Sequence, residues 1–212
     1  NSADADELVV LAERNDRVLQ VGHVERFNPA FEAVRAQLGR PLFIDAVRCG
    51  PFSGRSTDIG VVLDLMIHDL DVALSLQPGE LRSVDAIGLP VLGHNEDLAQ
   101  AWLRFEGGCV AQFQASRVST VAQRTMRVFF ETGFASIDFG AKTVDLVRPS
   151  VPVLTGQVNV DAMTPEQRTH VKENLFTDYL PRISVAVTDH NAIAKEHENF
   201  VAAICGVESV RV

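Results

Sequence analysis

Three polar side chains in one segment have the types and the spacing that acid–base chemistry requires. Asp64, His68 and Asp71 lie in an otherwise mainly apolar run from Val61 to Leu74. At about 100° per residue of an α-helix, His68 lies about 40° and Asp71 about −20° from Asp64, so the three form one stripe. A helix that is apolar on most other sides should be largely buried, and a narrow polar stripe on it must face a partner, a metal or a cleft.

Three interpretations of this stripe stay open on the residues alone. The carboxylates and the imidazole can be satisfied by backbone groups or arginines, as buried polar groups generally are. The stripe can hold a metal, although the remaining histidines show no paired spacing that would complete a tight transition-metal site. It can also perform acid–base chemistry, in which Asp64 sets the tautomer and pKa of His68 and the imidazole takes a hydroxyl proton as a hydride departs.

The composition excludes several classes of partner. The net charge of −9 offers no electrostatic footprint for a nucleic acid or an anionic membrane surface. With 46% hydrophobic and 22% charged residues, the chain has the composition of an ordinary globular protein, and no apolar run approaches the roughly 20 residues that span a bilayer. The three cysteines, Cys49, Cys109 and Cys205, fit neither a disulfide framework nor a metal knuckle, so we expect reduced thiols and a cytoplasmic protein.

The elements around the stripe alternate at first and then become a run of strands. The first part predicts, in chain order, a helix through about Ala12, a strand at Val18–Val21, a helix from Pro29 to about Leu38, a strand at Leu42–Val47, a polar loop at Gly50–Asp58 and a helix at about Val61–Leu76. Period-two alternation then predicts six strands of an antiparallel meander, at 82–89, 97–105, 109–118, 124–131, 135–139 and 143–147.

The end of the chain is predicted to change character again. Residues 149–182 are predicted to be irregular and to reach over a site or a neighbouring subunit. A helix is expected at 191–205 and the start of a strand at 207–212. Together the elements predict an α+β fold in which a large, mostly antiparallel open sheet is covered on one face by helices.

Several polar residues outside the stripe are candidates for contact with a substrate. Arg26 and Asn28 follow a strand end, where ligands gather in open α/β sheets. A salt bridge of Arg26 and a helix cap by Asn28 are compatible with that role. Arg48 and Arg55 flank the loop before the stripe, and if the substrate is a nucleotide sugar we expect Arg55 to contact its diphosphate.

Three further arginines, Arg117, Arg124 and Arg127, lie on or beside predicted strands. We expect each of them to pair with an acidic residue across the sheet.

The spacing Gly60-x3-Asp64-x3-His68-x2-Asp71, preceded by the loop Gly22–Pro29 (GHVERFNP), resembles the Gfo/Idh/MocA family of NAD(P)-dependent sugar and cyclitol oxidoreductases. The two motifs together narrow the resemblance towards members of the UDP-N-acetylglucosamine 3-dehydrogenase type.

The resemblance implies an N-terminal Rossmann domain that binds NAD or NADP and a C-terminal α/β domain whose open sheet makes the oligomer interface. By this resemblance Asp64 and His68 would be the catalytic pair. Separately, from their positions in the sequence, Arg26, Asn28, Arg55 and Asp71 are predicted to contact the substrate. The implied partners are a sugar-type small molecule and further copies of the chain, as a homodimer or homotetramer through the open sheet face.

The chain departs from the family pattern in its first part. It has no G-x-G-x-x-G phosphate turn, and none of its lysines, Lys142, Lys172 and Lys195, lies beside a proline as the family's catalytic lysine does. We therefore expect residues 1–26 to be the last helix and strand of a dinucleotide-binding domain. Residues 27–212 would form the C-terminal substrate-binding and oligomerisation domain, truncated at its C-terminus.

The resulting functional prediction is a fragment of an NAD(P)-dependent oxidoreductase that oxidises a hydroxyl of a sugar, nucleotide sugar or cyclitol, with His68 as general acid/base. No metal is expected, most of the cofactor site would lie outside this chain, and the chain alone should be inactive. The alternative is a non-catalytic dimerisation or binding module. A metal-dependent hydrolase that uses Asp64, His68 and Asp71 is the less favoured third possibility.

Overall fold

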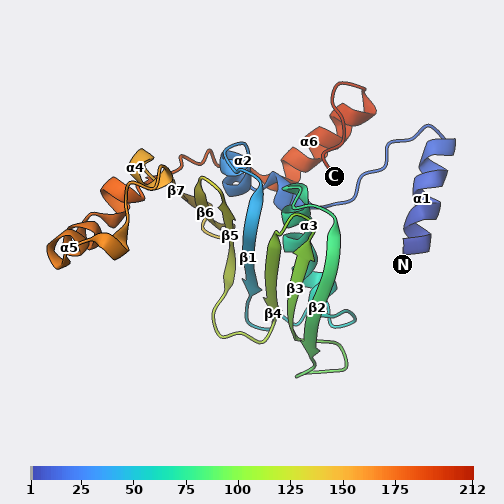
Figure 1. Ribbon diagram of the computed structural model, residues 1–212. Coiled ribbons are helices and arrows are strands. Elements are labelled where there is room, and N and C mark those ends of the chain that lie inside the picture. Colours follow the sequence, from blue (N-terminus) through green and yellow to red (C-terminus); the bar gives the residue numbers. More distant parts are fainter. Residues whose placement is uncertain (1) are drawn as a thin grey trace.

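Eight strands form one open sheet at the centre of the molecule (Figure 1), in the spatial order β2-β3-β4-β1-β5-β6-β7-β8. The computed structural model describes residues 2–212, so Asn1, the first residue of the predicted remnant, lies outside the described residues. The strands are β1 (Pro41–Cys49), β2 (Leu81–Leu89), β3 (Leu98–Phe105), β4 (Val110–Ser116), β5 (Gln123–Phe130), β6 (Gly133–Asp138), β7 (Thr143–Val147) and β8 (Arg182–Ser184). Neighbouring strands run antiparallel except β1 and β4, which confirms the predicted sheet.

Strand β1 lies in the middle of the sheet, between β4 and β5. The predicted meander is therefore wrong at one point, because β4 and β5 follow one another along the chain without being neighbours. Period-two alternation indicates which face of a sheet a side chain occupies, and it carries no information on which strand lies beside it. The insertion places Arg48, near the end of β1, directly opposite Arg124 of β5.

Helices cover one face of the sheet and enclose the hydrophobic core (Figure 1). They are η1 (Val24–Phe27), α2 (Pro29–Arg35), the π-helical turn η2 (Val62–Met66) and α3 (Ile67–Ser75). Alternate strand residues such as Ile44, Phe113 and Met126 point into this layer and are fully buried. The predicted coverage of one face by helices is thus confirmed.

The opposite face of the sheet carries the other set of alternating side chains, which are half-buried or exposed. Three phenylalanines from neighbouring strands form a row across it. The ring centres of Phe43 and Phe129 lie 5.8 Å apart, and those of Phe129 and Phe134 lie 5.1 Å apart. This open face is therefore partly aromatic.

Two helices and two irregular segments lie outside the sheet layers. The predicted first helix is present as α1 (Ser2–Arg14), which lies to one side of the sheet (Figure 1), and the predicted helix near the other end is present as α6 (Ala192–Ile204), packed against η1. The predicted strands at Val18–Val21 and 207–212 are wrong, because both segments are irregular. A strand needs a neighbour for its backbone groups, and no described strand lies beside either segment.

Residues 148–181, between β7 and β8, form an arm that extends away from the sheet (Figure 1). The prediction of an irregular segment is wrong, because the arm contains α4 (Val151–Leu154), η3 (Val160–Ala162), α5 (Pro165–Glu173) and η4 (Leu175–Tyr179). Two of its prolines lie in the first turn of a helix, Pro152 in α4 and Pro165 in α5. Pro165 follows a capping box, in which Thr164 and Gln167 bind one another's backbone N–H. None of the helices in residues 2–212 is long and apolar enough to cross a membrane.

Candidate active site

The helix that carries the stripe begins with a π-helical turn, η2, before it continues as α3. Glu96 holds this turn from the β2–β3 loop: its backbone oxygen accepts from Val61 N at 3.0 Å and its Oε1 from Val62 N at 3.2 Å. Gly60 leaves room for this contact, because a Cβ at this position would collide with the Glu96 carboxylate and displace it. A π turn is wider than an α turn, so it changes the direction of Asp64 from the one expected at 100° per residue, and such turns are frequent at functional sites.

Asp64 lies at the wall of a polar cavity of about 440 Å³. The cavity is bounded by the loop after β1, by the start of η2 and by β4 and β5. Four arginines line it together with Asp64: Arg48, Arg55, Arg117 and Arg124. No described residue forms a hydrogen bond or an ion pair with the Asp64 carboxylate, so this acid is free to contact a ligand.

His68 lies one turn further along the helix and is half-buried. Its Nδ1 is buried and has no hydrogen-bond partner among the described residues, so the expected orientation of the imidazole by the Asp64 carboxylate is not seen. Burial, together with the positive charge of Arg48, lowers the pKa of His68, although Glu25 and Asp69 act in the opposite direction. A lowered pKa keeps the imidazole neutral near pH 7, and a neutral imidazole can accept a proton.

A buried ion-pair network lies beneath His68. Arg48 Nε and Nη2 donate to Asp69 Oδ2 and Oδ1 at 3.0 and 2.7 Å, and Arg48 Nη1 donates to Glu25 Oε1 at 2.8 Å. Asn28 completes the network through Nδ2, which donates to Glu25 Oε2 at 3.0 Å and to the backbone oxygen of Phe139 at 3.2 Å. All four polar residues are less than a tenth exposed. The network ties β1, α3 and the loop before α2 together.

The positive charge of Arg48 is secured by these contacts. Burial alone would lower the pKa of the guanidinium, but the hydrogen bonds and charges of Asp69 and Glu25 outweigh burial and raise the pKa above its usual range. A bidentate pair of this kind also fixes orientation, because the planar guanidinium matches the carboxylate at two points. Arg48 therefore acts as a fixed positive charge near His68.

Asp71, the third residue of the predicted stripe, is already bound within the protein and is not free to hold a ligand or a metal. Arg26 Nε and Nη2 donate to its two carboxylate oxygens at 2.7 and 2.6 Å, and His23 Nε2 lies 3.9 Å from Oδ1. Among the described residues, no group of three or more His, Cys, Asp or Glu side chains is placed to hold a metal ion. The hydrolase interpretation therefore loses its third candidate ligand.

The other predicted substrate contacts are distributed around the helix. The pair with Asp71 confirms the salt bridge of Arg26, which also donates to the backbone oxygen of Arg211 at 2.7 Å. Asn28 caps α2, since its Oδ1 accepts from Ala30 N at 3.1 Å. Arg55 is exposed at the rim of the polar cavity beside Asp64. Of the predicted substrate-binding residues, only Arg55 therefore shares this cavity with Asp64.

Two expectations about the helix and the sheet arginines need correction. The helix is not buried on all its apolar sides, because Leu63 and Leu74 are 60% and 51% exposed. Arg117 and Arg127 pair with acids as expected, but Arg124 does not. Its neighbour on β1 is Arg48, which is another arginine.

Sequence reasoning missed Glu25 and Asp69 as site residues. The alternation in β1 indicated that a buried acid was needed, because Arg48 lies on the same face of the strand as the core residues Ile44 and Ala46. An arginine on the core face of a strand requires a buried acid nearby. The sequence alone gives no indication of which acid that is.

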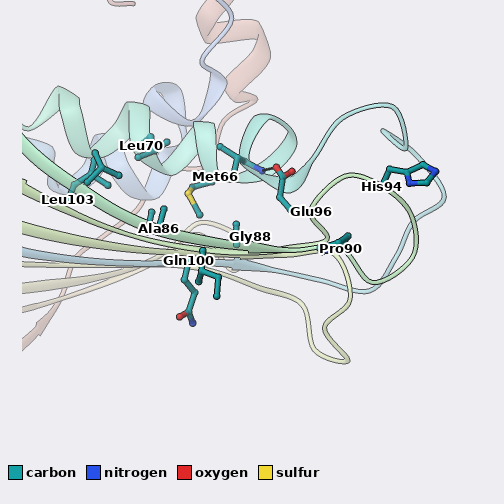
Figure 2. A pocket seen from close by; sticks show the side chains of 14 residues that line it. Met66, Leu70, Ala86, Gly88, Pro90, His94, Glu96, Gln100 and Leu103 are labelled. Atoms are coloured by element: carbon teal, nitrogen blue, oxygen red, sulfur yellow. Dashed lines mark hydrogen bonds between the residues drawn. The ribbon is translucent and has the colours of Figure 1, made fainter.

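A second cavity, of about 550 Å³, lies between the helix and the strands β2 and β3. Figure 2 shows Met66 of the helix facing Ala86 and Leu103 of the sheet across it. The Glu96 carboxylate at its rim is already bound to the backbone N–H of Val62. This cavity is mainly apolar and offers no free carboxylate, unlike the polar cavity with Asp64, and His68 is not among the residues that line either cavity.

The fold and the motif define a class of protein. Residues 32–136 match the GFO/IDH/MocA C-terminal domain. The chain therefore carries the C-terminal domain of the Gfo/Idh/MocA family.

Among individual relatives, the chain is 38% identical to UDP-N-acetylglucosamine 3-dehydrogenase of Acidithiobacillus ferrooxidans over 157 residues. The aligned region covers 74% of this chain and 50% of that protein. The chain is also 27% identical to scyllo-inositol 2-dehydrogenase (NAD(+)) of Bacillus subtilis over 117 residues. That alignment covers 48% of this chain and 34% of the relative. The chain thus spans half or less of the length of these relatives.

Solved structures show the same fold. The Acidithiobacillus enzyme superimposes with a TM-score of 0.82 at 33% identity, over 99% of this chain and 61% of that chain. An inositol dehydrogenase homologue from Azotobacter vinelandii, complexed with NADH and myo-inositol, superimposes with a TM-score of 0.60 at 17% identity, over 68% of this chain and 43% of that chain. The second likeness concerns the fold alone.

Removing one partner of the buried network should destabilise the protein strongly. We expect Asp69→Asn to lower the free energy of unfolding by about 3–5 kcal/mol, because it leaves Arg48 short of a buried counter-charge. Urea denaturation measures this loss. The matched control is Asp45→Asn, in the exposed cross-strand pair Asp45–Arg127, which should cost less than about 1 kcal/mol. Equal losses in the two variants would contradict the assigned role of the network.

The pKa of His68 should lie below its ordinary value of about 6.5 in the folded protein. A histidine-detected NMR titration measures it, with the urea-unfolded protein as reference. Asp69→Asn should lower the pKa further, because the Asp69 charge favours the protonated ring. Since the unfolded chain binds the proton more readily, this histidine should cost stability as the pH falls below about 6.5. A folded-state pKa at or above the reference would contradict the assignment.

Proposed function

We propose that this chain is the substrate-binding part of an NAD(P)-dependent oxidoreductase that oxidises a hydroxyl of a sugar, nucleotide sugar or cyclitol. The observation that carries the proposal is the state of His68: a half-buried imidazole with a free Nδ1 and a lowered pKa, one turn from the unpaired carboxylate of Asp64. Family membership and the names of the relatives support it.

In the proposed reaction, His68 takes the proton of the substrate hydroxyl while the carbon releases its hydride. The O–H and C–H bonds break, a C=O double bond forms, and the imidazole becomes an imidazolium. Asp64 then lies one turn away from the new positive charge and stabilises it. Arg48 limits how long the proton stays on the ring, because its fixed charge disfavours the imidazolium.

A bound nicotinamide would supply the hydride acceptor. The chain contains no G-x-G-x-x-G turn, so we place the binding of the cofactor phosphates outside residues 1–212. The exposed leucines of the helix, Leu63 and Leu74, suit a surface that a dinucleotide-binding domain covers. We propose that residues 1–26 belong to that domain and residues 27–212 to the substrate domain.

We also propose that copies of the chain associate through the open sheet face, as a homodimer or homotetramer. The aromatic row of Phe43, Phe129 and Phe134 supports this association, because aromatic residues are enriched at protein interfaces. The same row favours the second candidate function, a non-catalytic dimerisation module. The two functions differ in whether the intact protein binds and reduces NAD(P).

The test uses the full-length protein with NAD or NADP and a panel of sugars, nucleotide sugars and cyclitols, followed by NAD(P)H absorbance. We expect His68→Asn to lower kcat/KM by about 10²–10⁴-fold, because the general base is lost, while NADH binding measured by fluorescence stays unchanged.

The control is His170→Asn, at an exposed histidine in the arm, which should retain full activity. The 212-residue chain alone should show no turnover. Wild-type activity in His68→Asn would contradict the assigned general base, and an intact protein that does not bind NADH would favour the dimerisation module.

A further inference from the structure

The polar cavity beside Asp64 contains more positive charge than its surroundings use. Two of its four arginines are neutralised within the protein. Arg48 is paired with Asp69 and Glu25, and Arg117 Nε donates to Asp97 Oδ1 at 2.6 Å.

The other two arginines, Arg55 and Arg124, form no hydrogen bond or ion pair with any described residue. The cavity therefore holds two uncompensated guanidinium groups against the single free carboxylate of Asp64. This surplus stands out in a chain whose net charge is −9.

The place of Arg124 makes this surplus costly. Arg124 lies directly opposite Arg48 in the antiparallel pairing of β5 and β1. Like charges directly opposite one another destabilise a sheet. The buried acids Asp69 and Glu25 neutralise the charge of Arg48, whereas no acid of the described residues neutralises the charge of Arg124. An anionic ligand in the cavity would provide this counter-charge.

The loop that carries Arg55 is fastened in position. Arg117 donates from Nη1 to the backbone oxygen of Ser56 at 2.6 Å and from Nη2 to that of Ile59 at 2.9 Å. Ser56 itself has a φ of 52°, a left-handed conformation that is uncommon for residues other than glycine. The residue after Arg55 is therefore held in an uncommon conformation by a buried arginine, which limits the positions that Arg55 can reach.

We propose that Arg55 and Arg124 bind the phosphate groups of the substrate, so that the enzyme acts on phosphate-bearing sugars, such as sugar nucleotides, in preference to neutral cyclitols. This inference rests on the proposed function, because it places the substrate in the cavity that contains Asp64. Guanidinium groups match phosphate oxygens in a bidentate manner, and such charge-assisted hydrogen bonds are about twice as strong as neutral ones. The relatives include one enzyme of each substrate type, and the charge of the cavity favours the first.

The test measures binding without requiring turnover. Isothermal titration of the full-length protein with UDP should give clear binding, while uridine, which has the same base and no phosphate, should bind at least tenfold more weakly. Arg124→Met and Arg55→Met should each weaken UDP binding by about 10–100-fold. Circular dichroism verifies that the variants fold, as expected for exposed side chains.

Two further variants make the test specific. Arg124→Lys keeps the charge and loses the bidentate geometry, so it should recover part of the affinity. The matched control is Arg82→Met, at an exposed arginine of β2 that does not line the cavity, and it should leave UDP binding unchanged.

In turnover with a UDP-sugar, Arg124→Met should raise KM and leave kcat within about twofold, because the phosphates bind equally well before and in the transition state.

The outcomes separate this inference from the proposed function. If UDP binds Arg55→Met and Arg124→Met as tightly as it binds the wild type, the phosphate assignment is overturned, whether or not His68-dependent NAD(P) reduction is seen. If UDP binding depends on both arginines but no sugar is oxidised, the phosphate site is supported and the proposed dehydrogenase function fails.

Discussion

The bidentate pair of Arg48 with Asp69, closed by Glu25, is the interaction on which the site depends. Arg48 extends from the central strand, Asp69 from the helix that carries His68, and Glu25 from the loop before α2. Because buried charges are costly unless they are paired, these three elements are held in one arrangement. That arrangement fixes the position of the helix relative to the sheet, and with it the positions of Asp64 and His68.

The same network sets the electrostatics around the imidazole. A fixed guanidinium and two carboxylates act on His68 with opposite signs, and burial tips the balance towards the neutral ring. The charges that form the structural ion pairs thus also act on the imidazole of His68. This double role explains why several charged residues surround His68, since some of them position the others.

The helix divides two environments. On one side, its apolar residues face the sheet and a mainly apolar cavity (Figure 2). On the other side, the π turn directs Asp64 into a cavity rich in arginine. The wider turn separates Asp64 from Asp71, which binds Arg26 instead. Two acids of one helix therefore have different surroundings. Asp64 lines an open cavity, and Asp71 is bound in a salt bridge.

Much of the fold followed from local patterns. Alternation located all the strands of the sheet except the short β8, and the Asn28–Pro29 pair located the start of α2, because these signals depend on neighbours along the chain. The capping box at the start of α5 is an equally local signal. It was missed because the many prolines of this segment indicated irregular structure. The position of β1 between β4 and β5 was not predictable, because strand order depends on contacts between distant segments.

By itself, the sequence determined the α+β class, the helix with Asp64 and His68, and the family resemblance, since each depends on residue types at short spacing. Only the tertiary structure decided which charges meet. It paired Asp69 rather than Asp64 with the buried arginine, removed Asp71 from the stripe, and left Arg124 opposite Arg48 without an acid. Ion pairs between distant residues depend on where the backbone carries them, and a sequence lists the charges without their distances.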